Sequence, residues 1–465
     1  MKETASLSRL EKFKRHYNAW VVNETLEDYS LRYAPKSFRR WSEFTVANTA
    51  LGGISYLADF AIGGSIAISS GFANSFWAII ISAVIIFVTG VPISYYAARY
   101  NIDMDLLTRG AGFGYIGSTL TSVIYASFCF IFFALEGAIM AQALELYFKL
   151  PLAWGYLLCT VAIFPLVVFG MTLLATLQVW TQPIWLLGMF APWFAVWMKD
   201  PTTWSTWYNF AGKSPSGAGF NALLCASAAG VALSLIAQIG EQVDYLRFMP
   251  DLTPQSKGKW WWAVMLAGPG WVILGAWKQL AGGFFTALAV RNGVAISKAN
   301  EPIQMYIEGF KEIFSNPAIY PAIYLAVATF FVILSQIKIN VTNAYSGSLS
   351  WSNFFSRLTH AHPGRVVWLV FHLIIALVLQ ELGVFDALSW VLGFYSNVEI
   401  AWVGALVADL VVNKPLGLSP SYIEFKRAHL YNFNPVGFGS MTIAAIISVI
   451  AFFGVMGPGA QACST

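Results

Sequence analysis

Charged residues are scarce in this chain. They make up 11% of its 465 residues, whereas they account for about a quarter of a soluble globular domain. Apolar residues make up 57%, and the mean hydropathy is +0.62. The composition therefore excludes a soluble globular protein. It predicts a multi-pass protein of the cell (inner) membrane, with the lipid bilayer as its surroundings.

Cysteines and catalytic motifs are scarce as well. The four cysteines have no paired spacing, so neither a disulfide framework nor a zinc site is supported. The sequence has no phosphate-binding glycine loop followed by Lys-Ser/Thr and no His-Glu-x-x-His pair. We therefore expect no enzyme activity, no cofactor, no metal centre and no nucleic-acid partner.

Long apolar runs predict eleven membrane-spanning helices, each near the ~20 residues that a bilayer requires. They cover residues 43–69, 73–98, 113–146, 152–172, 174–198, 218–247, 260–290, 318–346, 365–382, 384–412 and 437–457. The segments around them are expected to be a basic tail at 1–42, an outer loop at 199–217, an inner loop at 413–436 and a tail at 458–465, with 437–457 as an additional span.

The positive charges predict how these spans are oriented. With the basic tail in the cytoplasm, nineteen Lys and Arg residues fall on the inner side and six on the outer side. This asymmetry follows the positive-inside rule, so we expect a cytoplasmic N-terminus. The odd number of spans leaves the last residues outside, and we expect a sequence truncated before a twelfth span.

Two spans carry glycines at corresponding places. The first has Gly52-Gly53 and Gly63-Gly64 on either side of polar residues, and the sixth has Gly230 and Gly240 in the same arrangement. Interrupted helices at matching positions of two halves are typical of secondary transporters built from inverted repeats. We therefore predict an all-α membrane protein with five-helix repeats at 43–198 and 218–412.

Ionisable residues within spans are the candidates for function, because a charge at mid-membrane costs about 2.5 to 3.5 kcal/mol or more. Lys338, Glu136, Asp59 and Glu241 lie deep in predicted spans. For Glu399, in the long tenth span, the sequence leaves open whether the residue is functional. Three other residues, Lys278, Asp244 and Asp409, are expected near span ends, where their charges can reach water or the interface.

Several short motifs resemble the nucleobase:cation symporter family, the purine-cytosine permeases, whose members have the leucine-transporter fold. The resemblance covers roughly residues 30 to 440. The motifs that carry it are Leu31-Arg32-Tyr33-Ala34-Pro35, Leu106-Leu107-Thr108-Arg109, Asp244-Tyr245-Leu246-Arg247-Phe248, Asn340-Val341-Thr342-Asn343-Ala344-Tyr345-Ser346 and Ala408-Asp409. It implies a fold of five plus five helices in which the first and sixth are broken.

The resemblance also implies where a substrate binds. The pocket would lie between the broken helices and the third and eighth spans, and would contain Tyr56, Phe132, Gln238, Glu241, Asn340 and Asn343. Asp59 and Glu136 join this set because of their depth. Aromatic faces and amide groups suit planar nitrogenous rings. Phe132 and Cys129 stand where relatives often have Trp and Gln, so a cationic or more polar nitrogenous substrate is an alternative.

A cation site is implied between the first and eighth spans. In sodium-coupled relatives it lies between first-span carbonyls, here Leu51 to Ile54, and two adjacent hydroxyl residues, here replaced by Lys338 and Ile339, with Thr342 nearby. Isoleucine cannot bind sodium, whereas an ammonium supplies a positive charge itself. We predict that Lys338 is a surrogate cation with Asp59 or Glu241 as its counter-charge. Sodium is then unnecessary, and a coupling proton is the alternative.

These features predict a secondary active permease for a small nitrogenous solute such as a nucleobase, purine or pyrimidine, allantoin or hydantoin. A second interpretation is a transporter-like sensor, in which the same pocket biases two conformations and a fused or associated signalling domain reads them. A channel is a third interpretation.

Overall fold

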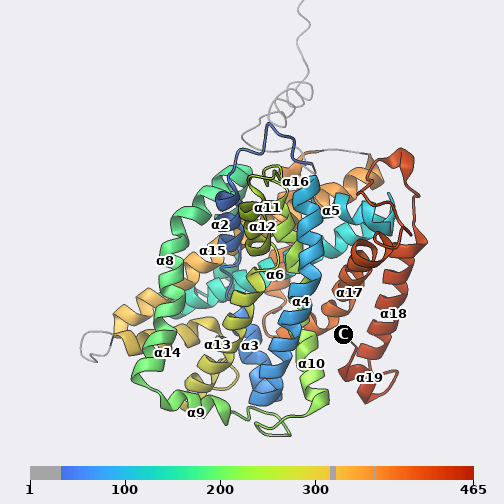
Figure 1. Ribbon diagram of the computed structural model, residues 1–465. Helices are drawn as coiled ribbons and strands as arrows, with labels where there is room; N and C mark the ends of the chain where they lie inside the picture. Colours follow the sequence, from blue (N-terminus) through green and yellow to red (C-terminus); the bar gives the residue numbers. More distant parts are fainter. Residues whose placement is uncertain (1–32, 315–320, 361–362, 465) are drawn as a thin grey trace, which may run out of the picture.

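A computed structural model describes residues 33–314, 321–360 and 363–464, which are almost entirely helical (Figure 1). Most of the predicted 1–42 tail therefore lies outside the described residues. The helices of the first half are α2 (Glu43–Gly53), α3 (Ala58–Ser70), α4 (Phe72–Tyr100), α5 (Met104–Thr108), α6 (Gly117–Phe148), α7 (Leu152–Val168), α8 (Gly170–Lys199) and α9 (Thr202–Tyr208), with a π-helical turn, η1 (Arg109–Phe113), between α5 and α6.

The second half follows the same plan. Its helices are α10 (Ala222–Leu233), the 3₁₀ segment η2 (Ser234–Gln238), α11 (Ile239–Leu246), α12 (Lys257–Ala267), α13 (Trp271–Arg291), α14 (Pro302–Ile313), α15 (Pro321–Thr359), α16 (Arg365–Glu381) and α17 (Leu388–Ala408). The chain then continues through η3 (Asp409–Asn413), η4 (Arg427–His429), η5 (Pro435–Gly439), α18 (Ser440–Phe452) and α19 (Pro458–Ala462).

Each of the eleven predicted spans contains a helix. Within the described residues, eight helices are long and apolar enough to cross a membrane, or nine if the bent pair α2 and α3 counts as one span. The other two predicted spans correspond to α7 and α16, which have 17 residues each. Two short helices in connecting segments, α9 and α14, were not predicted.

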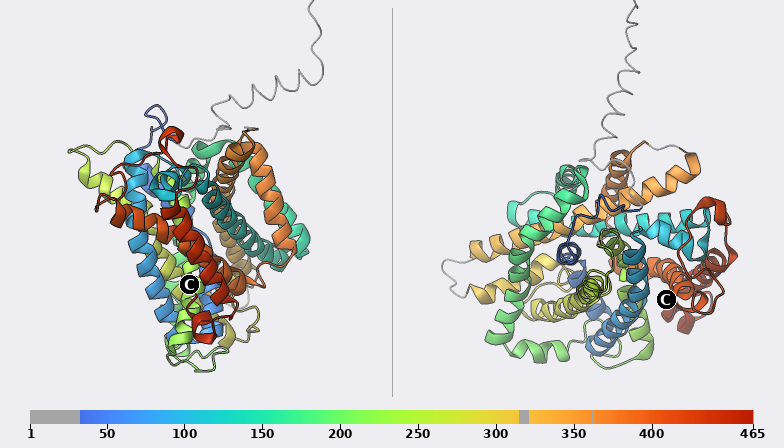
Figure 2. Two further views of the ribbon diagram at one scale, coloured as in Figure 1. Left: turned by 90° about the vertical axis from the view of Figure 1, so that its right-hand side faces the viewer. Right: turned by 45° about the horizontal axis from the view of Figure 1, so that its top comes forward.

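The third span, α6, is the most enclosed of these helices. Of its most apolar window, 83% is buried, compared with 33% for α4 and 17% for the segment that contains α18. It packs along α15 and also contacts α7 and α16, while α3 packs against α13. The α18 helix lies at the edge of the bundle against α17 (Figure 2). The broken first span therefore faces α13 on one side and α6 with α15 on the other.

The two interrupted spans differ. The chain between α2 and α3 leaves the helix, and the two halves are bent by 46°. The sixth span stays helical: its interruption is the tight 3₁₀ segment η2 between α10 and α11. The eighth span is longer than predicted, because α15 continues through Gly347 to Thr359. The ring of His372 from α16 lies so close to Gly347 that an added Cβ would be 2.1 Å from it.

Polar contacts close the end of the bundle at which α2 begins, at the top of Figure 1. Arg39 and Lys36, just before α2, pair with Asp251 after α11 at 2.5 and 3.1 Å. The hydrogen bonds from Arg39 and Lys36 lower the pKa of Asp251. These contacts connect the segment before the first span to the loop after the sixth.

Candidate functional site

The break in the first span is built from glycines and exchanged hydrogen bonds. α2 ends in Gly52 and Gly53, and residues 54–57 connect it to α3. Ser55 and Ser335 of α15 exchange hydrogen bonds: Ser335 Oγ donates to Ser55 O at 2.9 Å, and Ser55 Oγ donates to Ser335 O at 3.3 Å. Unwound backbone within a membrane persists only where protein or a cavity satisfies its polar groups. The break is therefore held by specific partners from other helices.

Lys278 of α13 is the main partner of the carbonyl groups at the break. Its Nζ donates to Ile54 O at 2.7 Å and to Tyr56 O at 2.9 Å, and it forms an ion pair with Asp59 at 2.9 Å. The same ammonium lies 3.6 Å from the centre of the Tyr56 ring. Lys278 is completely buried. Its predicted position near a span end is therefore wrong.

Asp59 begins α3 and is completely buried as well. In addition to Lys278, it accepts a hydrogen bond from Gln279 Nε2 at 2.9 Å. Two adjacent residues of α13 thus bind one carboxylate of α3. The helices approach closely at this level, since an added Cβ on Gly63 would be 1.8 Å from Gln279 O.

Glu136 of α6 occupies the opposite end of the break, at the start of α3. Its carboxylate accepts hydrogen bonds from Leu57 N at 3.3 Å and from Ala58 N at 3.2 Å, and from the side chain of Gln336. Gln336 Oε1 also accepts from Leu57 N. Glu136 is completely buried, so its depth was predicted correctly. Its partners are the protein's own backbone amides.

The predicted polar residues of the sixth and eighth spans form two pairs. Gln238 Nε2 donates to Glu241 Oε2 at 2.7 Å, and Asn343 Nδ2 donates to Asn340 Oδ1 at 3.2 Å. Asn340 Nδ2 approaches Phe133 O of α6 at 3.4 Å. All four side chains are buried, yet within the described residues Glu241 Oε1 and Asn343 Oδ1 have no hydrogen-bond partner. These two oxygens are therefore candidates for ligand contacts.

The two predicted aromatic residues are placed differently. Phe132 is buried against Phe128, with ring centroids 4.5 Å apart. The Lys278 ammonium lies over one face of the Tyr56 ring, whose centroid is 6.4 Å from that of the Trp271 ring. The predicted stacking role of Tyr56 is therefore limited, because one of its faces is already used.

The predicted cation site does not assemble around Lys338. Lys338 Nζ donates to Gln178 O at 3.2 Å and to Thr181 Oγ1 at 2.9 Å, both on α8. Thr342 instead contacts Tyr245, with 2.7 Å between the two hydroxyl oxygens, and Ile54 O binds Lys278. Leu51 is only partly buried, beside the groove between α2 and α12. The counter-charges predicted for Lys338 were wrong, since Asp59 pairs with Lys278 and Glu241 with Gln238.

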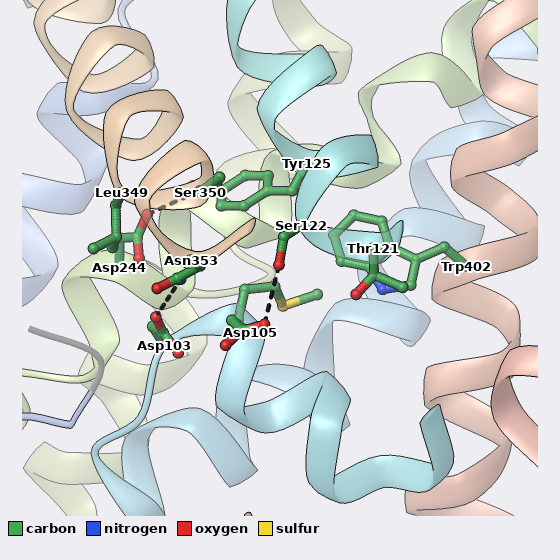
Figure 3. A pocket seen from close by; sticks show the side chains of 11 residues that line it. Asp103, Asp105, Thr121, Ser122, Tyr125, Asp244, Leu349, Ser350, Asn353 and Trp402 are labelled. Carbon is green, nitrogen blue, oxygen red and sulfur yellow. Dashed lines mark hydrogen bonds between the residues drawn. The ribbon is translucent and has the colours of Figure 1, made fainter. Parts of the chain in front are cut away.

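Further polar residues surround a small pocket between α5, α6, α11, α15 and α17 (Figure 3). Asp244 accepts from Tyr125 at 2.9 Å and from Ser346 at 2.7 Å, and it is 1% exposed, so its predicted solvated position is wrong. Asp103 accepts from Asn353, and Asp105 forms an ion pair with Arg357 at 2.5 Å. The contribution of α5 was not predicted.

Two other acids, Asp409 and Glu399, are also buried, and the prediction of an interfacial position for Asp409 is wrong. Asp409 is 2% exposed and lies 3.4 Å from Lys414, so it is a buried partner rather than an interfacial residue. Glu399 of α17 is completely buried, and in the described part of the chain neither of its carboxylate oxygens has a hydrogen-bond partner. Gln242, next to Glu241, is likewise buried without a partner for its amide. The sequence analysis did not single it out.

Comparison with solved structures identifies the fold. The chain superimposes on Mhp1, a nucleobase-cation-symport-1 family transporter, in a closed conformation with bromovinylhydantoin bound. The TM-score is 0.63 at 15% identity, and the match covers 94% of this chain and 92% of that one. The inward-facing conformation of Mhp1 matches with a TM-score of 0.59 at 14% identity, over 91% and 87% of the two chains.

This chain has the leucine-transporter fold. A Na+-coupled sialic acid symporter in its outward-open state also matches, with a TM-score of 0.54 at 13% identity, over 94% of this chain and 96% of that one. No protein-family model and no curated protein matches the sequence. The predicted resemblance to nucleobase:cation symporters is thus confirmed at the level of the fold.

Proposed function

We propose that this protein is a secondary active permease for a small nitrogenous solute, such as a nucleobase, allantoin or a hydantoin, in the cell (inner) membrane with its N-terminus in the cytoplasm. The observation that carries the proposal is the pair of free, buried oxygens, Glu241 Oε1 and Asn343 Oδ1, beside a broken first span. Buried polar groups are nearly always hydrogen-bonded, so a buried oxygen without a protein partner in a membrane helix is a candidate ligand contact.

The chemistry of these residues favours a ligand with N–H groups. Glu241 Oε1 and Asn343 Oδ1 are both acceptors when the carboxylate is ionised, and Asn340, which is hydrogen-bonded to Asn343, offers an amide. Ring N–H groups of nucleobases and hydantoins, or the N–H groups of a cationic amine, would satisfy them. The similarity to Mhp1 with bromovinylhydantoin bound supports the same class of solute. The proposal includes function without sodium, with a proton as the candidate coupling ion.

Replacing Asn343, its partner Asn340 or Glu241 with alanine should weaken ligand binding. Each change removes hydrogen-bonding groups at a buried site, which costs about 1 to 3 kcal/mol, or roughly 5- to 150-fold in affinity. The measurement is a thermal-shift screen of the purified full chain against purines, pyrimidines, hydantoins, allantoin and amines, followed by titration of the best ligand. A ligand that binds the folded state raises the melting temperature by mass action.

The matched control is Asn209→Ala. Asn209 is exposed at the end of α9, and its amide donates to Ser205 O of its own helix at 2.8 Å. This variant should bind as the wild type does. Unchanged affinity in both Asn340→Ala and Glu241→Ala would refute the proposed site. Uptake into vesicles distinguishes a permease from a channel. For a permease, the rate of uptake should reach a maximum as the solute concentration rises, and solute on the opposite side of the membrane should stimulate it.

A further inference from the structure

The two sides of the break in the first span have opposite electrostatic requirements. The carbonyl groups after α2 carry partial negative charge, and the amide groups at the start of α3 carry partial positive charge. In transporters with interrupted helices, such carbonyls coordinate the coupling cation, and such amides face anionic groups of the substrate. What occupies the two sides therefore indicates what the transporter must bind from solution.

The carbonyl side is occupied by Lys278. An ammonium has three N–H donors, and the structure provides three acceptors within hydrogen-bond distance: Ile54 O, Tyr56 O and Asp59 Oδ2, at 2.7, 2.9 and 2.9 Å. The Tyr56 ring covers the same charge at 3.6 Å. Oxygen ligands around a positive charge are also the surroundings of a bound alkali cation. Here the charge is covalently attached to α13.

The amide side is occupied by Glu136. Leu57 N and Ala58 N donate to its two carboxylate oxygens, and Gln336 holds the carboxylate in place. A substrate carboxylate at the start of α3 would have to displace Glu136 and would meet its negative charge and that of Asp59 nearby. Both sides of the break are therefore satisfied by side chains of other helices.

We propose that Lys278 is a tethered cation and Glu136 a tethered anion of the broken first span, so that this transporter binds its ligand without a metal ion and accepts neutral or cationic nitrogen compounds but not carboxylates. The part that concerns the ligand rests on the proposed function. The part that concerns the cation is independent of it, since Lys278 should stabilise the empty protein.

The cation is tested by thermal unfolding of the full chain, purified without substrate, in sodium chloride and in choline chloride. The wild type should melt at the same temperature in both salts. Lys278→Ala should melt several degrees lower, because three acceptors lose their donor. The lost atoms correspond to n-propylammonium, so this ion should restore part of the melting temperature. The neutral analogue n-propanol should not.

Lys338→Ala is the matched control. Lys338 is a second buried lysine, but its partners are one carbonyl and one hydroxyl of α8, and within the described residues it forms no ion pair with a carboxylate. We expect a smaller loss of stability and no selective rescue by n-propylammonium. Lys278→Met, which keeps the volume of the side chain without its charge, covers the case in which Lys278→Ala does not fold.

Three results would overturn the proposal that Lys278 is a tethered cation. The first is a higher melting temperature of the wild type in sodium chloride than in choline chloride. The second is a Lys278→Met variant as stable as the wild type, and the third is rescue of Lys278→Ala by n-propanol as well as by n-propylammonium. The last result would show that Lys278 acts through its volume rather than its charge.

The ligand part is tested with pairs of compounds that differ by a carboxylate, such as uracil and uracil-6-carboxylate, or hydantoin and hydantoin-5-acetate. The neutral member should raise the melting temperature of the wild type more. A carboxylate that stabilises the protein more than its neutral partner would overturn this part. If no nitrogenous compound binds, the proposed function fails, whereas the salt and rescue experiments still decide whether Lys278 is a tethered cation.

Discussion

Gly63→Ala should prevent the chain from reaching its folded state in useful amounts. A Cβ at Gly63 would be 1.8 Å from Gln279 O and 2.5 Å from the carbonyl carbon of the same residue. These are backbone atoms of α13, so no side-chain rotation can relieve the clash. Overpacking a well-packed core typically costs about 1 to 3 kcal/mol, and a clash between two backbones should cost at least that.

The contact at Gly63 is reciprocal. A Cβ on Gly282 of α13 would be 2.2 Å from Phe60 O of α3. Small residues on both helices thus allow the close approach that packing within membranes favours. The approach also brings Lys278 and Gln279 to Asp59, so separating the helices should break the ion pair and open the site as well as destabilise the fold.

The measurement is the yield of monodisperse protein after extraction, followed by its melting temperature and ligand affinity. Gly404→Ala is the control, because Gly404 also lies in a membrane helix but has nothing within 4 Å of an added Cβ. Replacing a helical glycine with alanine without a clash should be neutral or stabilise by about 0.5 to 1 kcal/mol. If Gly63→Ala yields as much stable, binding-competent protein as Gly404→Ala, the packing of α3 against α13 is not as described.

The sequence predicts the fold better than the site, and the lysines show why. Apolar runs give the positions of the helices, and glycines give the break. A single sequence does not show which neighbouring helix each side chain of a span faces. Gln336 and Lys338 are two residues apart, which is about 200° around α15. Gln336 therefore contacts Glu136 at the break, while Lys338 faces α8. The resemblance to sodium-coupled transporters placed Lys338 at the cation site, because Lys338 and Ile339 stand where those relatives have hydroxyl residues.

Lys278 could have been found from its neighbours. Gly275 and Gly282 lie three residues before it and four after it, on the same face of α13. Glycines on both sides of a charged residue in a span indicate that another backbone comes close there, and an added Cβ on Gly275 would be 3.4 Å from Asp59 Oδ2. The two acids at the break, Asp59 and Glu136, could be identified from the sequence because they lie deep in predicted spans. Their partners could not, because they come from helices more than 70 residues away in the chain.

Glu136→Ala should cause the second large loss, in both stability and ligand binding. The change leaves Ala58 N without its acceptor, whereas Leu57 N keeps Gln336 Oε1 and Gln336 Nε2 keeps only the backbone carbonyl of residue 136 at 3.2 Å. Each buried donor without a partner costs about 1 to 3 kcal/mol, and within a membrane water cannot replace the acceptor. The start of α3 should then move, together with Asp59 and the Lys278 ion pair.

Glu136→Gln distinguishes the effect of the carboxylate's negative charge from the effect of the hydrogen bonds that it accepts. Its amide oxygen can still accept from one backbone amide, so this variant should fold better than Glu136→Ala. It removes the negative charge that excludes carboxylates, so it should bind a carboxylate-bearing ligand more tightly than the wild type does.

Glu145→Ala, at an exposed position on the same helix α6, is the control and should change neither stability nor ligand preference. Melting temperatures and titrations of neutral and carboxylate ligands measure both effects. A Glu136→Ala variant as stable as Glu145→Ala would show that α3 does not depend on this carboxylate. Unchanged preference in Glu136→Gln would mean that another group selects the ligand's charge.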